Sequence, residues 1–108
     1  MIEDKDVYSL VHYEYGVAYS GEYGGMRYRI ARSPLERVFG KKDKGEAKLE
    51  VNIWRGPFCF DKTSEEITTR FFEFTEEGKT EAVAFINGEY EDKKEFWKKG
   101  KVSEVLNK

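Results

Sequence analysis

The chain has 108 residues and a mass of 12.7 kDa, which is enough for one compact core and too little for two. We therefore expect a single domain over residues 1–108. Charged residues make up 37% and aromatic residues 16%, and this composition argues against disorder and against a collagen-like fibre. The single cysteine excludes an intramolecular disulfide, and together with the single histidine it excludes the usual zinc cages built from Cys and His.

The ends of the chain and its charges bear on location and partners. Residues 1–6 are acidic where a secretory signal would be basic, and no stretch approaches the roughly 20 apolar residues that span a bilayer. We therefore expect a cytoplasmic protein with no membrane contact. Residues 27–44 hold seven basic and two acidic side chains, a net +5, so the rest of the chain must carry −7 to reach the total of −2. That segment predicts a basic face, although a lysine loop such as 41–45 is more often simply solvated.

Alternation of apolar and polar side chains predicts four strands, near residues 11–20, 26–32, 47–54 and 67–74. Glycines between the first two strands can take the positive φ angles of a tight turn, which indicates a hairpin. The fourth strand is rich in β-branched and aromatic residues. In the first strand, the side chains that alternation assigns to the buried face are Val11, Tyr13, Tyr15, Val17 and Tyr19.

Two segments carry helix-start signals. Ser33 as an N-cap, Pro34 in the first turn and Glu36 three residues after the cap predict a short helix near residues 34–39, ending at Gly40. Thr75, followed by two glutamates, predicts a longer helix near residues 76–97 with one apolar face. Asn87-Gly88 is also the best hairpin dipeptide in the chain, so a hairpin of residues 80–86 and 89–97 is the alternative.

These elements predict the fold class. The hairpins are local and each strand has one polar face, so an antiparallel sheet covered on one side by helices is the economical arrangement. We expect an α+β domain in which the C-terminal helix packs on the ring-bearing face of the sheet.

The residues that could carry chemistry favour structural roles. Cys59 lies between two phenylalanines with no charge beside it, which is typical of a small buried hydrophobe. His12, the only imidazole, is more simply a surface or hydrogen-bonded strand residue than a base. The glycines at 21, 24 and 25 do not have the spacing of a phosphate-binding loop. We predict no catalytic residue, no metal site and no cofactor.

The aromatic and arginine residues are the candidates for binding. Tyrosines and arginines crowd the predicted hairpin, and a second group surrounds the turn after the third strand; together they supply Arg27, Arg29, Arg32, Tyr23, Trp54 and Arg55. The competing interpretation is that the tyrosines pack beneath the helix and the arginines pair outside with acids such as Glu14 or Glu50. For the turn after the third strand, the competing interpretation is that Trp54 and Phe58 belong to the core, because Trp is usually mostly buried.

Three hypotheses follow for function. The first is a non-catalytic protein-interaction module that binds a partner protein or a second copy of itself. The second is a single-stranded nucleic-acid-binding domain that uses the hairpin and the basic segment 27–44. The third is a small-molecule-binding protein or an enzyme whose pocket leaves no mark in the sequence.

Overall fold

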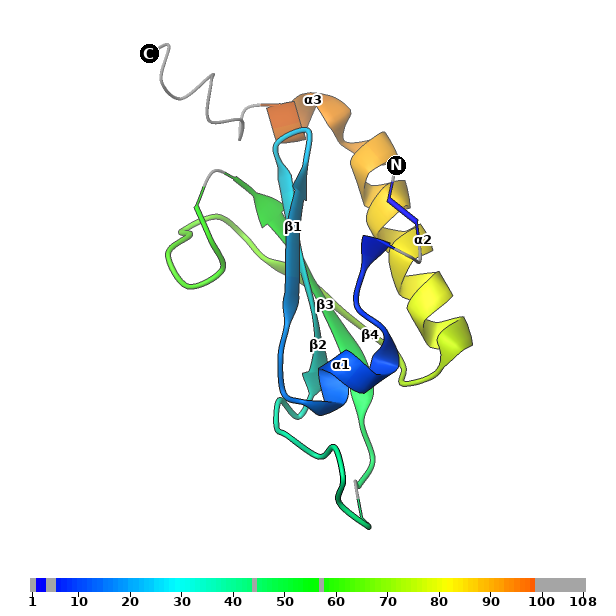
Figure 1. The fold of residues 1–108 in the computed structure, drawn as a ribbon. Coiled ribbons are helices and arrows are strands. Elements are labelled where there is room, and N and C mark those ends of the chain that lie inside the picture. The colour runs from blue at the N-terminus through cyan, green and yellow to red at the C-terminus, as the bar shows by residue number, and fades with distance from the viewer. Residues whose placement is uncertain (1, 4–5, 44, 57, 99–108) are drawn as a thin grey trace.

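Four antiparallel strands form one sheet, and the longest helix lies across one of its faces (Figure 1). The computed structural model describes residues 2–3, 6–43, 45–56 and 58–98. In sequence order the elements are α1 (Leu10–Glu14), β1 (Tyr19–Tyr23), β2 (Met26–Ser33), β3 (Lys48–Arg55), β4 (Thr68–Glu73), α2 (Glu76–Asp92) and α3 (Lys94–Lys98). The strand order is β1-β2-β3-β4, so the expected α+β class is confirmed.

The β1–β2 hairpin has the tight turn that its glycines predict. Tyr23 is paired with Met26, and the two residues between them, Gly24 and Gly25, have φ angles of +59° and +96°. A two-residue turn with both central φ angles positive matches the right-handed twist of the flanking strands. The turn fixes the register, which places Arg27 and Arg29 on the face of β2 opposite Met26 and Tyr28.

The core lies between the sheet and α2. One face of β2 and β3, called the inner face below, presents alternate large apolar side chains, and α2 presents a stripe at helical spacing. The buried residues of this layer are Met26, Tyr28, Ile30, Leu49, Val51, Ile53, Ala82, Val83 and Ile86. The C-terminal helical segment therefore covers the ring-bearing face of the sheet, as predicted.

Helix α2 begins as its sequence predicts. The Thr75 hydroxyl accepts a hydrogen bond from the Gly78 amide at 2.9 Å, which satisfies one free donor of the first turn. The predicted helix 76–97 is divided at Lys93, where α2 ends and α3 follows. Asn87 and Gly88 both lie within α2, so the alternative hairpin is wrong. The Asn87 side chain exchanges two hydrogen bonds with the backbone of Ile2 and so fastens the N-terminal segment to the helix.

Two predictions of local structure are wrong. Residues 10–14 form α1, and only the end of the expected strand 11–20 is extended, in β1. Within α1, Tyr13 is fully buried whereas Val11 and Tyr15 are exposed, which alternation does not produce. The ring of Tyr8 lies 5.8 Å from that of Tyr13 and 5.1 Å from that of Tyr19. Burial of this ring cluster outweighs the weak preference of the segment for extended backbone.

The expected short helix at residues 34–39 is absent, and the segment is a loop with a turn at its end. Its backbone groups find partners elsewhere. The Pro34 carbonyl accepts from the Arg32 guanidinium at 2.7 Å, and the Val38 and Phe39 amides both donate to the Glu14 carbonyl, at 2.7 and 3.0 Å. Tertiary hydrogen bonds therefore replace the intrahelical bonds that the capping signals predict.

Two glycine substitutions should change stability in opposite directions. At Gly24 an added Cβ would lie 2.7 Å from Cε1 of Tyr90 and the positive φ would be strained, so Gly24→Ala should lower the free energy of unfolding by more than about 1 kcal/mol. At Gly88, inside α2, nothing lies within 4 Å of the added Cβ, so Gly88→Ala should raise it by about 0.5–1 kcal/mol. Urea unfolding of the two variants measures both; equal effects would contradict the turn geometry.

The buried tyrosines predict a loss of stability in alkali. Burial raises the pKa of both the Tyr13 and Tyr28 hydroxyls, and neighbouring tyrosines add to the shift. Because the folded pKa exceeds the unfolded value of about 10, the stabilisation is complete below that pH and is lost as pH rises above it. Urea unfolding at increasing pH should show this decline, and Tyr13→Phe or Tyr28→Phe should make it shallower. An unchanged slope in both variants would contradict the burial of these hydroxyls.

Candidate interaction surface

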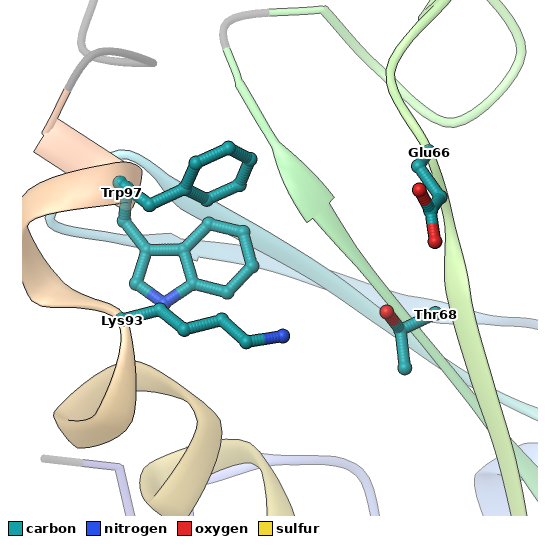
Figure 2. A pocket seen from close by; sticks show the side chains of 5 residues that line it. Glu66, Thr68, Lys93 and Trp97 are labelled. Carbon is teal, nitrogen blue, oxygen red and sulfur yellow. The ribbon is translucent and has the colours of Figure 1, made fainter.

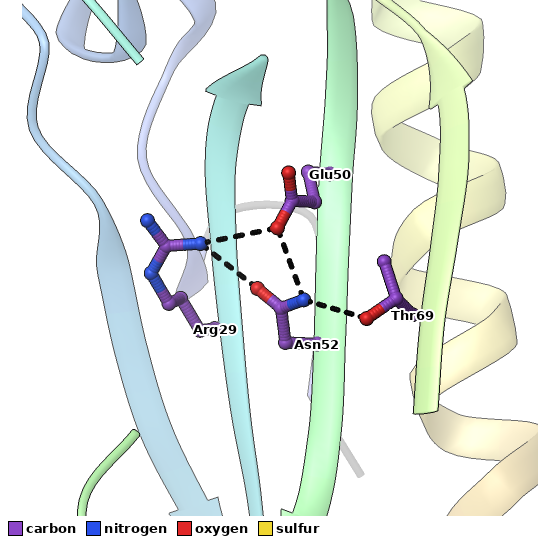
Figure 3. A network of polar contacts seen from close by, with 4 residues as sticks. All are labelled: Arg29, Glu50, Asn52 and Thr69. Carbon is purple, nitrogen blue, oxygen red and sulfur yellow. Dashed lines mark hydrogen bonds and ion pairs between the residues drawn. The ribbon is translucent and has the colours of Figure 1, made fainter. Parts of the chain in front are cut away.

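The sheet face opposite α2, the outer face, carries a polar network around one of the predicted arginines (Figure 3). Arg29 donates from Nη1 to Oδ1 of Asn52 at 2.8 Å, and the same nitrogen lies 3.6 Å from the Glu50 carboxylate. Asn52 in turn donates to Glu50 and to Thr69, at 3.1 and 3.0 Å. Residues of β3 therefore hold the Arg29 guanidinium. This agrees with the interpretation in which the arginines pair with acids such as Glu50.

The loop between β3 and β4 covers part of this outer face. Trp54 is buried, and its Nε1 donates to the Phe58 carbonyl at 2.8 Å while its ring lies 5.5 Å from that of Phe60. The Arg29 guanidinium lies 4.7 Å from the Phe60 ring centroid. The core position expected for Trp54 is confirmed, whereas that of Phe58 is wrong, because its side chain is exposed. Arg27 is paired in register with Trp54 and with Glu22.

The other three predicted binding residues lie in different parts of the fold. Arg32 is buried on the inner face and lies 3.5 Å from the Glu36 carboxylate, in addition to its bond with Pro34. Tyr23, at the hairpin tip, meets the Tyr90 ring edge-on at 4.7 Å. Arg55 pairs with Glu65 at 2.8 Å and lies over the Phe96 ring at 4.5 Å. The six residues are therefore distributed over both faces and the tip of the sheet.

A groove of about 350 Å³ lies between α3 and the start of β4 (Figure 2). Its lining is mostly apolar and includes Phe96, with Trp97 and Lys93 on one wall and Thr68 and Glu66 on the other (Figure 2). Trp97 is buried and donates from Nε1 to the Glu89 carbonyl at 2.9 Å, and the Lys93 ammonium pairs with the Glu89 carboxylate at 3.1 Å. The groove has room for a small ligand, but its Trp and Lys side chains already have partners within the protein.

A second hollow, of about 320 Å³ and more polar, lies at the other end of the sheet. Glu14, Arg32, Glu73 and Thr75 supply its polar lining. Glu73 pairs with Lys48 at 2.7 Å, and the Thr75 hydroxyl caps α2. These groups hold neighbouring elements together at the point where α1, β4 and the start of α2 meet.

The two reactive side chains lie at the surface. Cys59 is exposed on the β3–β4 loop, so the expectation of a buried thiol is wrong. His12 lies on α1, where its Nδ1 is 2.9 Å from the Ser9 hydroxyl and its ring stacks on Tyr8 at 5.1 Å. Among the residues that the structure describes, no group of three or more His, Cys, Asp or Glu side chains is arranged to hold a metal ion.

Two exposed rings meet where the end of α1 lies against the loop at residues 35–39. The Tyr15 and Phe39 rings stack at 4.4 Å with an interplanar angle of 25°, and the two side chains remain 41% and 38% exposed. Val11, one helical turn before Tyr15, is 47% exposed. We call the stacked rings together with Val11 the Tyr15–Phe39 surface; Val17 and Leu35, in the same two segments, are exposed as well.

The backbone holds this surface in place. Both amides of Val38 and Phe39 bond to the carbonyl at the end of α1, as described above, and Val38 itself is buried. Gly16, with φ +84°, passes so close to the loop that a Cβ there would lie 3.1 Å from the Arg37 amide nitrogen. The Arg37 guanidinium lies over the Tyr15 ring, 5.6 Å from its centroid. The backbone hydrogen bonds and the close approach at Gly16 therefore hold the two stacked rings in a fixed position.

The sequence contains only part of the signal for this surface. Alternation places Val11, Tyr15 and Val17 on the buried face of a strand, and the expected helix 34–39 would place Leu35 and Phe39 on one shared face. Both assignments are wrong, because residues 10–14 form α1, residues 34–38 form a loop, and only Tyr19 and Ser20 of the expected strand are extended. Once α1 is known to be a helix, the spacing of Val11 and Tyr15 is the signal that would have indicated an exposed apolar stripe.

Comparisons with protein-family models, curated proteins and solved structures found no match for this chain. No helix in the described ranges is both long enough and apolar enough to cross a membrane. Proposals about function therefore depend on the side chains described above.

The exposure of Cys59 makes a direct prediction. In the folded protein its thiol should react with a chromogenic disulfide reagent at a rate close to that of the urea-unfolded chain, because no packing shields it. Absorbance stopped-flow measures both rates, and Cys59→Ser provides the blank. Reaction only under unfolding conditions would contradict the exposed position.

Proposed function

We propose that this protein is a non-catalytic protein-interaction module and that the Tyr15–Phe39 surface is its contact site. The observation that carries the proposal is the exposed, stacked ring pair at a junction fixed by backbone hydrogen bonds. Single exposed apolar residues are ordinary, whereas contiguous groups of them mark binding surfaces.

The composition of the surface supports a protein as partner. Aromatic side chains bury a large area on binding and lose little conformational entropy, which is why they dominate protein interfaces. Because Tyr15 and Phe39 already stack on each other, their side chains lose little further conformational entropy when a partner binds. The exposed aliphatic side chain of Val11 also gains free energy from burial against another apolar surface.

The contacts of the predicted arginines weigh against the nucleic-acid alternative. Arg29 is held by Asn52 and Glu50, and Arg32 is buried against the Pro34 carbonyl and near Glu36. A phosphate would have to displace these partners before either guanidinium could contact it. Tyr23 is packed against Tyr90, which occupies part of the ring that a base would stack on.

Site-specific photocrosslinking tests the proposal. A benzophenone side chain placed at Phe39 should capture a partner protein from extract of the producing cells, and the same group at Phe71, a single exposed ring on β4, should not. The captured protein is then purified and its affinity measured by calorimetry. Wild-type protein should bind it, and Phe39→Ser should weaken binding by about thirtyfold or more, as expected for a central aromatic contact. Equal binding by both would overturn the proposed site.

Two further measurements separate the alternatives. Sedimentation of the protein alone over a range of concentrations shows whether the partner is a second copy of this chain, in which case Phe39→Ser should abolish the dimer.

Labelled single-stranded RNA and DNA are titrated at low salt with wild type and with the Arg27→Ala, Arg29→Ala double variant. Oligonucleotide binding that the double variant loses would favour the nucleic-acid function instead.

A further inference from the structure

Strand β1 forms an open edge of the sheet. It is the first strand in the order β1-β2-β3-β4, and in Figure 1 it stands in front of the other strands, with no helix or loop of the described ranges drawn across it. The pair that flanks a two-residue turn, here Tyr23 and Met26, is a hydrogen-bonded one. Because bonded and non-bonded pairs alternate along an antiparallel ladder, the amides and carbonyls of Ser20 and Glu22 point away from β2. Both residues are exposed, so these backbone groups can bond to another strand.

The β1 edge lacks the features that usually protect an edge strand from pairing. The strand contains no proline and no lysine, and Glu22 is its one charged residue. The Glu22 carboxylate accepts a hydrogen bond from the Gly25 amide at 2.7 Å, so it is turned back toward the hairpin tip. At the other edge of the sheet, β4 carries Arg70 and Glu73, both of them exposed charges. The unprotected edge is therefore β1.

Tyrosines line the inner face of the β1 edge. Tyr19 and Tyr23 lie on that face on either side of Gly21, which is paired with Tyr28. The Tyr28 ring lies over Gly21, where an added Cβ would be 2.5 Å from its Cζ atom. Tyr19 is half-buried beside Tyr28, with ring centroids 6.1 Å apart, and Tyr23 is 37% exposed. A row of rings thus runs alongside the outward-pointing backbone groups.

We propose that β1 pairs antiparallel with β1 of a second copy of this chain, with the two-fold axis at Gly21. This register aligns the whole strand with itself, so that Ser20 faces Glu22 of the second copy and Tyr19 faces its Tyr23. About four backbone hydrogen bonds form, two at each pairing of Ser20 with Glu22. Tyr19 and Tyr23 meet in the non-bonded pairs, where side chains lie closest and aromatic pairs stabilise the sheet.

The strand is complementary to itself in this register. A pairing centred on Glu22 would instead place two carboxylates directly opposite each other, which is destabilising. The two-fold contact uses the β1 edge of each copy once, so assembly stops at a dimer. The edges that remain at its two ends are the charged β4 strands. This contact is separate from the Tyr15–Phe39 surface, and each can exist without the other.

Sedimentation equilibrium with two proline variants tests the proposal. Ser20→Pro removes an amide that points away from β2, so it should leave the monomer folded and abolish pairing. Phe71→Pro is the matched control, because the same alternation, fixed by the bond from the Gly56 amide to the Gly25 carbonyl, places the Phe71 amide on the open side of β4. Circular dichroism checks that both variants fold.

Wild type, Phe71→Pro and Phe39→Ser should all dimerise, with a Kd below about 1 mM for a contact of this small size, and Ser20→Pro should stay monomeric. A wild type that remains monomeric up to about 1 mM would overturn the proposal. A dimer that Ser20→Pro retains would also overturn it, and loss of that dimer in Phe39→Ser would assign self-association to the Tyr15–Phe39 surface instead.

Amide exchange followed by NMR provides a readout on the wild type that needs no variant. Raising the protein concentration to about 1 mM should slow exchange of the Ser20 and Glu22 amides at least about twofold, because pairing protects them by mass action. The Thr69 and Phe71 amides, on the open side of β4, should exchange at an unchanged rate. Slowing at β4 in place of β1, or at neither edge, would contradict the proposed pairing.

Discussion

Contact between the inner face of the sheet and helix α2 is the interaction on which the other features depend. Ile30, Val51 and Ile53 meet Ala82 and Ile86 in a fully buried layer. This layer fixes the direction of every strand side chain, because a shift of one residue in register would turn the apolar set toward solvent. It also determines that the arginines at odd positions of β2 lie on the opposite face, where they meet the polar residues of β3.

The segments outside this layer take their structure from tertiary contacts. Helix α1 is a five-residue helix, far below the length at which an isolated helix is stable, so its docking must supply the stability. The burial of Tyr13 provides the docking, and the Glu14 carbonyl at the end of α1 accepts hydrogen bonds from two amides of the loop at residues 35–39. The same few contacts that make α1 persist therefore also place the Tyr15 and Phe39 rings together at the surface.

The sequence predicts the core layer better than it predicts the segments outside that layer. The strands at 26–32 and 47–54 and the cap at Thr75 are local signals that agree with the core, and all three are confirmed. The expected strand 11–20 and helix 34–39 are wrong because hydrogen bonds and ring contacts between distant segments replace the local preference. Alternation alone does not distinguish an exposed apolar side chain from a buried one. The Tyr15–Phe39 surface therefore cannot be predicted without the tertiary positions of α1 and the loop at residues 35–39.

The use of the cations follows from their chemistry. A guanidinium is planar and presents several donors, so it suits sites where fixed partners surround it, as Arg29, Arg32 and Arg55 are surrounded. These are the residues that a count of charges along the sequence puts forward first, yet the fold engages them in its own contacts. On the proposed function, recognition uses instead the exposed rings of Tyr15 and Phe39, which the tertiary structure places side by side.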